Sequence, residues 1–250
     1  MVSPQPPTYE CIRLDRDGPL TWLTLNRPDK LNAMNRQLLE ELSAALSVLA
    51  EDGATRVIAI RGAGRAFSAG YDIERSDDAH EVDIVDDYLT HAGYLNRFLQ
   101  IWDHPKPVIA EDAVVGWPSL PLGGGYISPL WVPLVGPKRA KQMSFVAGSR
   151  ISGQTASDWG WANYAVPAAE LEANVRELAV GIARIPASTL RMKKMAINRV
   201  ADVMGFRTTV AMGAETDALL HYSAEVRALA ALIQEHGLKA AIARFREDAG

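Results

Sequence analysis

The sequence predicts an α/β fold whose final third is helical. In its first quarter, a strand pattern at residues 20–25, a helix pattern at 35–50 and a short buried strand pattern at 57–61 follow one another. That order is typical of a right-handed crossover unit in a parallel sheet. From Pro186 onward, every periodic segment has the helical spacing of apolar residues. Together these observations predict a sheet-based core followed by a helical region.

The other elements of the first half follow from local signals. Residues 11–15 and 20–25 read as strands on either side of the turn Arg16-Asp17-Gly18-Pro19, which predicts a β-hairpin. Apolar side chains recur at helical spacing across residues 83–102. Two prolines follow and end that helix, because the residue before a proline avoids the helical region. Residues 108–110 then start another strand.

The second half contains weaker strand signals and stronger helix signals. Residues 111–135, with a glycine triplet and four prolines, predict an ordered loop region with short elements. We expect a core at residues 1–185 and a helical region at 186–250, whose apolar faces are better used in subunit contacts than left in water. The predicted helices after the loop region are 139–147, 155–161, 171–185, 189–204, 210–230 and 231–245.

Composition excludes several classes of partner. The formal net charge is −4, and no run of Lys or Arg supplies the basic footprint that nucleic acid or an anionic membrane requires. Cys11 is the only cysteine, so neither an intrachain disulfide nor a cysteine-based zinc site can form, and a reducing, cytoplasmic compartment is expected. The first residues lack the features of a signal peptide, and no apolar stretch approaches the length of a membrane span.

A glycine-rich stretch at residues 61–72 is the first candidate for function. It follows the strand predicted at 57–61, which is where α/β proteins place their ligands. The sequence contains no recognisable metal-ligand cluster, dinucleotide fingerprint or nucleophilic triad, so neither a metal nor a redox cofactor is expected. We assign no catalytic or binding role to His91 or His104.

Four segments, read in order, resemble the crotonase (enoyl-CoA hydratase/isomerase) superfamily. They are LTLNRPDKLNAM at 23–34, AFSAGYDI at 66–73, PVIA at 107–110 and LVGPKRAK at 134–141, within a likeness that extends over roughly residues 10–200. The resemblance implies a spiral of ββα units with a helical C-terminal region, assembled as trimers or paired trimers. It also implies an acyl-coenzyme A thioester as substrate, so that coenzyme A arrives with the substrate and no separate cofactor is needed.

The resemblance assigns the first half of an oxyanion hole. It implies that the main-chain N–H of Tyr71 meets the thioester oxygen, with Ala69, Gly70, Asp72 and Ile73 around it. Preorganised N–H donors stabilise the oxyanion that forms next to such a carbonyl by several kcal/mol, and small residues let the backbone approach it closely. The plainer interpretation is that Ala69-Gly70 is only a tight turn.

The first segment resembles the wall of the coenzyme A site. The resemblance implies that Lys30, Leu31 and Ala33 contact the pantetheine and adenine, with Lys30 near a phosphate. A lone lysine is more often a solvated surface charge, and that alternative stays open.

The sequence departs from the family after Ala110. Family members carry there a strand end, a second glycine-rich loop and a buried helix, which supply the second oxyanion N–H and, in hydratases, one of two catalytic glutamates. Between Ala110 and Glu111 this segment is missing, and a crossover between parallel strands needs a dozen residues or more. The triplet Gly123-Gly124-Gly125 does not replace it, because residues 111–118 already match the family's next strand and turn.

The second hydratase glutamate is also replaced. Ser119 follows the turn of Gly116, Trp117 and Pro118 at the position where the family carries that glutamate. Gly116 and Trp117 are candidates for binding the substrate, and Trp117 could line an acyl pocket, with core or interface packing as the alternative. Ser119 stays a catalytic candidate, because a serine can orient a water or donate a hydrogen bond, although its unperturbed hydroxyl is a poor general base. Glu74 is the candidate acid or base, with a solvated surface carboxylate as the alternative.

Two functions remain open at this point. The first is an enzyme that stabilises a thioester enolate, acting as an enoyl-CoA hydratase or isomerase. The second is a catalytically inactive protein of the same fold that binds coenzyme A or serves as a scaffold subunit, because both glutamate positions and half of the oxyanion hole are lost. Retained thioester affinity without turnover would favour the second.

Overall fold

A computed structural model describes residues 8–72, 83–110, 114–122 and 127–248. The chain forms two compact units that alternate along the sequence: residues 1–73, 99–113 and 167–198 in the first, and residues 74–98, 114–166 and 199–250 in the second. The division at residue 185 stays a prediction.

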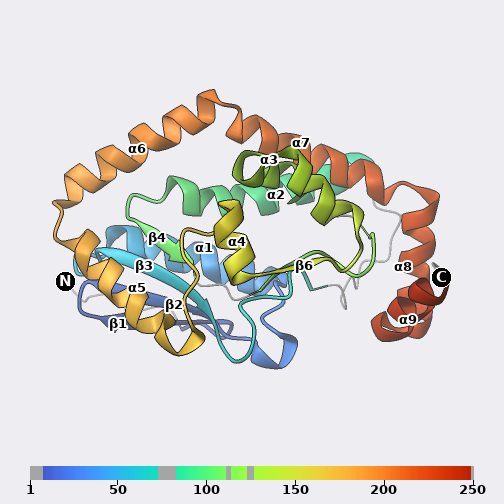
Figure 1. The fold of residues 1–250 in the computed structure, drawn as a ribbon, viewed down its shortest axis with the longest axis horizontal. Helices are drawn as coiled ribbons and strands as arrows, with labels where there is room; N and C mark the ends of the chain where they lie inside the picture. Colours follow the sequence, from blue (N-terminus) through green and yellow to red (C-terminus); the bar gives the residue numbers. More distant parts are fainter. Residues whose placement is uncertain (1–7, 73–82, 111–113, 123–126, 249–250) are drawn as a thin grey trace. The chain divides into compact units, whose positions relative to one another are not determined.

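The first unit contains a four-stranded sheet in the order β1-β2-β3-β4 (Figure 1). β1 (Ile12–Asp17) and β2 (Leu20–Leu25) form the predicted antiparallel hairpin. Because β1 continues to Asp17, the turn is limited to Gly18 and Pro19 and is shorter than the sequence suggested. β3 (Val57–Gly62) runs parallel to β2, and β4 (Val108–Ala110) runs parallel to β3. These parallel neighbours confirm the predicted α/β fold.

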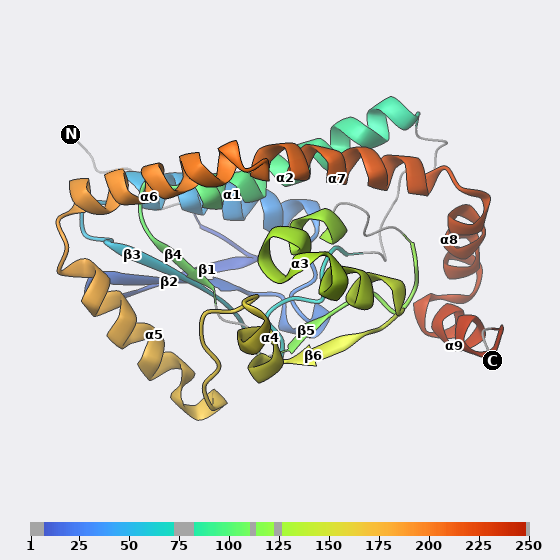
Figure 2. The same ribbon diagram turned by 45° about the horizontal axis from the view of Figure 1, so that its top comes forward.

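Helices cover both faces of this sheet, as Figure 2 shows. Successive side chains of a strand point to opposite faces of the sheet. The buried residues of β2 and β3 therefore belong to two hydrophobic clusters, one on each face. On one face the strands pack against α1 (Arg36–Glu51), whose first turn is capped by the Asn35 side chain. On the other face they pack against α5 (Ala168–Ala183) through Val175 and Ala179.

α2 (Ile84–Asp103) lies within one residue of its predicted ends. Its buried face was predicted less well. Leu95 is buried at 4% exposure, whereas Leu89, counted among the apolar positions, is 58% exposed. Helical spacing therefore identified the helix, because it depends on local sequence alone, but did not identify which residues a neighbour covers.

The second unit contains a short antiparallel pair, β5 (Val114–Gly116) and β6 (Arg150–Ser152), followed by α4 (Gly153–Trp159). α3 (Ile127–Phe145) bends at Gly136, whose φ of 79° and ψ of 161° are not helical. The prediction of irregular structure through residue 135 is therefore wrong from Ile127 onward. Pro129 and Pro133 concealed this helix, because a proline inside a helix removes a backbone hydrogen bond and is rare there. Pro137 begins the stretch after the bend, where a missing N–H costs little.

The C-terminal helices have different bounds from those predicted. α6 (Ala187–Val203) is followed by α7 (Phe206–His221), α8 (Ala224–His236) and α9 (Leu238–Asp248). The predicted helices at 210–230 and 231–245 are both wrong. The Ser223 hydroxyl accepts a hydrogen bond from the Val226 N–H and starts α8, and Gly237 separates α8 from α9. Within the ranges given above, no helix is long and apolar enough to cross a membrane.

Candidate active site

The loop after β2 has an unusual backbone. A single 3-10 turn at Pro28–Lys30 ends in two consecutive left-handed residues, Leu31 with φ 50° and Asn32 with φ 54°. Asn adopts this region more readily than most residues do, whereas Leu has no such preference. Such a conformation persists only where surrounding contacts fix it.

Asn32 supplies those contacts. Its side chain is fully buried, at 0% exposure. Its amide Nδ2 donates to the carbonyls of Ala63 at 2.8 Å and Ala66 at 2.7 Å, and its Oδ1 accepts from the Arg27 N–H at 2.9 Å. One buried side chain thus ties the loop after β2 to the glycine-rich loop after β3.

The glycine-rich loop is also paired to the first loop through its backbone. The Ala69 N–H donates to the Leu31 carbonyl at 2.9 Å. The Ser68 hydroxyl donates to the Asn32 carbonyl at 2.9 Å and accepts from the Gly70 N–H at 3.1 Å. The amides of Ala69 and Gly70 are therefore engaged within the protein.

Tyr71 is held by a parallel bridge to Met34. The Met34 N–H donates to the Gly70 carbonyl at 2.8 Å, and the Asp72 N–H donates to the Met34 carbonyl at 3.2 Å. In such a bridge the two neighbours of the central residue make the bonds, so the N–H and C=O of Tyr71 itself point away from Met34. This geometry fixes the direction of the Tyr71 N–H.

An ion pair closes the same loop. The Arg27 guanidinium lies 2.9 Å from the Asp72 carboxylate, and both side chains are largely buried, at 18% and 8% exposure. Arg27 also donates to the Ala33 carbonyl. The Asp72 carboxylate is thus occupied in holding the loop.

Gly62 is required where β3 enters the loop. A Cβ atom at this position would lie 2.3 Å from the Ala66 carbonyl oxygen and 2.4 Å from that of Phe67. Both are backbone atoms that no rotamer change can move away. The close turn back over the strand end therefore depends on glycine.

The predicted substrate-binding residues lie on these two paired loops and differ in exposure. Lys30 and Ala69 are exposed, Leu31 is half-buried, and Ala33 is buried. Ile73 and Glu74, which the sequence placed next to the site, lie outside the described residues.

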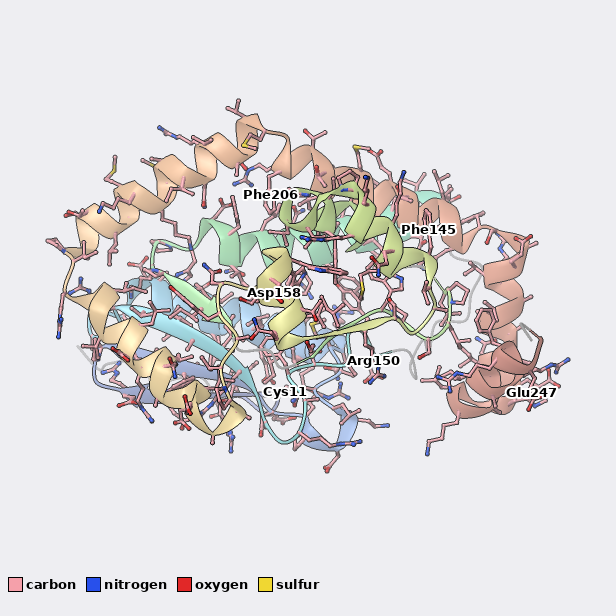
Figure 3. All side chains as sticks on the ribbon, in the orientation of Figure 1. Cys11, Phe145, Arg150, Asp158, Phe206 and Glu247 are labelled. Atoms are coloured by element: carbon pink, nitrogen blue, oxygen red, sulfur yellow. The ribbon has the colours of Figure 1, made fainter. Side chains whose placement is uncertain are left out.

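The second predicted part of the site, Gly116 to Ser119, belongs to the other unit. Gly116 is exposed and pairs with Arg150 across the short β5–β6 ladder, and Figure 3 shows Arg150 on that ribbon. The Trp117 N–H donates to the Ser149 carbonyl at 2.8 Å, and the Gly148 N–H donates to the Pro118 carbonyl at 2.8 Å. Ser119 is half-buried beside Gly148, where a Cβ would lie 3.3 Å from its hydroxyl.

Trp117 lies in an aromatic cluster. Its ring is 5.9 Å from that of Trp131 in an edge-on arrangement, and Trp131 is 5.8 Å from Trp161. Trp131 is buried at 5% exposure and packs with Val135 and Met143. These aromatic rings contribute to the core of the second unit.

Sequence reasoning missed the buried polar groups around this framework. The sequence shows Asn32 only as an asparagine in a predicted turn, which is common and does not indicate a buried structural role.

Lys194 is a second buried polar residue that the sequence did not reveal. Burial lowers the pKa of Lys194 to about 8, with Asp103 acting in the opposite direction. Its ammonium donates to the carbonyls of Ile101 and Lys106, both at 3.1 Å. No local sequence signal identifies such a lysine, since its acceptors lie far away along the chain.

Comparison with known proteins agrees with the resemblance noted in the sequence. A family model described as enoyl-CoA hydratase/isomerase matches residues 16–125 and 121–227. A Mycobacterium bovis protein named as a probable enoyl-CoA hydratase is 32% identical over 216 residues, which cover 77% of this chain and 82% of that protein. The mitochondrial enoyl-CoA hydratase of Pongo abelii is 29% identical over 231 residues, covering 80% of this chain and 74% of its own.

Solved structures give the same answer. A candidate enoyl-CoA hydratase/isomerase from Novosphingobium aromaticivorans is 34% identical with a TM-score of 0.88, covering 96% of this chain and 100% of that one. An enoyl-CoA hydratase/isomerase from Xanthobacter autotrophicus is 27% identical with a TM-score of 0.86, covering 94% and 97%. From the matched family model and these relatives, the chain belongs to the enoyl-CoA hydratase/isomerase family of enzymes and has the crotonase fold.

Proposed function

We propose that the protein binds an acyl-CoA thioester and stabilises its enolate with the main-chain N–H of Tyr71. The observation that carries this proposal is the bridge between Met34 and Tyr71, which directs that N–H away from the loop that holds it. The names of the relatives, as enoyl-CoA hydratases, support the substrate class.

The chemistry follows from where charge develops. Removing a proton from the carbon next to the thioester carbonyl moves negative charge onto the carbonyl oxygen. A donor already fixed in direction stabilises that oxygen without reorganising, and loss of one such donor typically costs a factor of 10² to 10³ in rate. Asn32 and the Arg27–Asp72 ion pair hold the loop that carries this donor.

The remaining residues take roles by position. Lys30, Leu31 and Ala33 contact coenzyme A, with Lys30 near a phosphate. Ala69, Gly70, Asp72 and Ile73 surround the thioester, and Gly116 and Trp117 border the acyl group. Glu74 and Ser119 are the candidates for moving protons, and the reaction is hydration or double-bond isomerisation of an enoyl thioester.

We also propose that the chain assembles with copies of itself as a trimer or hexamer. The support comes from large apolar side chains on α6: Met192 is 58% exposed, Ile197 67% and Val203 90%. Left in water, such a row is unfavourable. Light scattering after gel filtration gives the mass, and a monomer would contradict this assignment.

A catalytically inactive binding subunit is the second candidate, and the region after Ala110 favours it. β4 ends at Ala110 and β5 begins at Val114, and these strands belong to different sheets. The family model matches as two stretches, residues 16–125 and 121–227, and not as one continuous stretch. Ser119 in place of a glutamate points in the same direction.

Three proteins test the proposal: the wild type, Tyr71→Pro, which lacks the N–H, and Tyr71→Phe, which keeps it. Turnover of crotonyl-CoA is followed by loss of the enoyl thioester absorbance, and binding of saturated butyryl-CoA by calorimetry. We expect the proline variant to lose about 10²-fold or more in kcat and the phenylalanine variant to stay within about twofold. Circular dichroism checks that both variants are folded.

The outcomes separate the two candidates. Turnover that depends on the Tyr71 N–H supports the enzyme. Butyryl-CoA binding without turnover supports the inactive binding subunit. A wild-type protein that neither turns over crotonyl-CoA nor binds butyryl-CoA contradicts both.

A further inference from the structure

We propose that Asp87, His91 and His221 form a binding site for a divalent transition-metal ion such as Zn²⁺, with Asp217 orienting the two imidazoles. Asp87 and His91 are four residues apart on α2, and Asp217 and His221 are four residues apart on α7. Figure 3 labels Phe206, the first residue of α7. Residues at this spacing lie on one face of a helix. Each helix therefore contributes one aspartate and one histidine to the same place.

The distances fit a metal centre. The His221 Nδ1 lies 2.8 Å from an Asp87 carboxylate oxygen, and the His91 Nδ1 lies 3.3 Å from the other. One potential ligand atom from each of these three residues lies within 4.8 Å of the other two. Ligands placed at about 2.0–2.2 Å from one tetrahedral zinc ion are about 3.3–3.6 Å apart. The hydrogen-bonded contact between His221 and Asp87 would therefore lengthen by about half an ångström when the metal binds.

Asp217 completes the arrangement from the other side. Its carboxylate lies 3.4 Å from the His91 Nε2 and 3.8 Å from the His221 Nε2. Each imidazole thus has one nitrogen facing Asp87 and the other facing Asp217. A metal-bound histidine usually donates its second N–H to a carboxylate or carbonyl, which fixes its orientation and raises its basicity.

Charge and burial favour a cation in this cluster. Asp217 is 2% exposed, Asp87 17% and His91 15%. With neutral imidazoles the four side chains carry a formal charge of −2, and burying such charge is costly unless it is compensated. A divalent cation compensates it fully. His221 is 31% exposed, which leaves an approach from solvent.

Two protonated imidazoles would also neutralise the cluster, and this is the competing explanation. The His91 Nδ1 lies 2.8 Å from the Asp87 main-chain carbonyl, a contact that needs a proton on that nitrogen. Metal binding displaces this proton, because a ligand nitrogen must offer its lone pair. The ligand set of two imidazoles and a carboxylate suits Zn²⁺ or Co²⁺ better than Mg²⁺ or Ca²⁺, which prefer oxygen.

The site was not visible in the sequence, where no metal-ligand cluster was expected. Asp87 and His221 are 134 residues apart. None of the four residues belongs to the segments proposed to bind the thioester, so this proposal does not depend on that function. Bound metal would cross-link α2 to α7 and raise the melting temperature.

The test titrates chelator-stripped full-length protein with ZnCl₂ by calorimetry. Four proteins are compared: wild type, His221→Gln, Asp217→Asn and the control His236→Gln, whose histidine is on α8 outside the cluster. We expect one Zn²⁺ per chain, a loss of more than about 100-fold in affinity for His221→Gln, and about 10–100-fold for Asp217→Asn, as for other residues that orient ligands. His236→Gln should match the wild type.

Addition of Co²⁺ to the wild type provides a measurement that needs no variant. Coordination by imidazole and carboxylate should give strong visible absorption, and an equivalent of Zn²⁺ should abolish it. The proposal is overturned if Zn²⁺ does not bind, if His221→Gln and His236→Gln bind it equally, or if Co²⁺ keeps the weak spectrum of the free aqueous ion. The last result would leave protonated imidazoles as the partners of Asp87 and Asp217.

Discussion

The loop that carries Tyr71 and the turn that carries Ser119 are built in opposite ways. The first is held by Asn32 at 0% exposure, by a backbone bridge and by an ion pair with both partners largely buried. The second is a turn of alternating exposed and half-buried residues beside a two-stranded ladder of three-residue strands. The proposed carbonyl-binding half is thus fixed by buried polar contacts, whereas the turn proposed to take part in proton transfer is only partly buried.

This difference shows how binding and turnover can be separated within one fold. Buried, fully bonded polar networks fix geometry and are costly to disturb. Short exposed ladders are opened at low free-energy cost. A chain that keeps the first part and alters the second would still polarise a thioester while changing, or losing, the reaction that follows.

The largest expected effect comes from adding one methyl group to each region. Gly62→Ala places a Cβ against two backbone carbonyls and should lower the free energy of unfolding by about 4 kcal/mol, beyond the usual cost of overpacking. Gly116→Ala meets its nearest atom at 3.4 Å, in the flexible Arg150 side chain, and should cost less than about 1 kcal/mol. Urea unfolding measures both, and equal losses would break the comparison.

A second pair removes one polar group from each region. Asn32→Ala leaves the Ala63 and Ala66 carbonyls without this donor and should cost about 3 kcal/mol, as for other buried groups left unsatisfied. Ser119→Ala should stay within about 0.5 kcal/mol, typical of a site with little burial.

The control for this pair is Asn174→Ala, which removes an exposed asparagine that bonds one carbonyl on its own helix. It should behave like Ser119→Ala. A cost below about 1 kcal/mol for Asn32→Ala would show that the loop does not depend on its buried amide.

The smallest effect is a dependence on pH located in the first unit. Burial lowers the pKa of His104 from its ordinary value of 6.5, although contacts with the Leu46 and Lys106 backbone act in the opposite direction. Between the lowered value and 6.5 the unfolded chain binds more protons than the folded one. Stability should therefore fall as pH drops through that window, by at most about 1.4 kcal/mol per pH unit.

Urea unfolding at several pH values between about 5 and 7.5 measures this slope. His104→Gln should flatten it, whereas Ser119→Ala should keep the wild-type slope, because its turn is in the other unit. An unchanged slope in His104→Gln would assign the proton uptake to other groups.

Local patterns predicted most of the fold. The apolar spacing of residues 35–50 predicted α1, and Asn35 does cap it. Alternation and the glycine-proline turn predicted the β1–β2 hairpin. The boundary between α7 and α8 was missed because apolar spacing continues through Tyr222 while the Ser223 cap interrupts the helix.

The candidate site was less accessible to sequence reasoning. The motif around Tyr71 identified a loop and a role, but not the direction of its N–H, which Met34 fixes through a bridge to a distant segment. The Asp87–His221 contact was hidden for the same reason. The aspartate and histidine four residues apart on α2, and those on α7, form a cluster only where the two helices pack together. Long-range pairing is set by the whole core and not by the residues that use it.

The contacts of Asn32 have an evolutionary consequence. Its partners are Arg27, Ala63 and Ala66. The other hydrogen bonds of the two loops also join residues no later in the sequence than Asp72. This half of the site is therefore encoded within one continuous stretch of fewer than a third of the codons. A change downstream of Asp72 leaves that stretch intact, so natural selection can act on thioester recognition and on the subsequent chemistry separately.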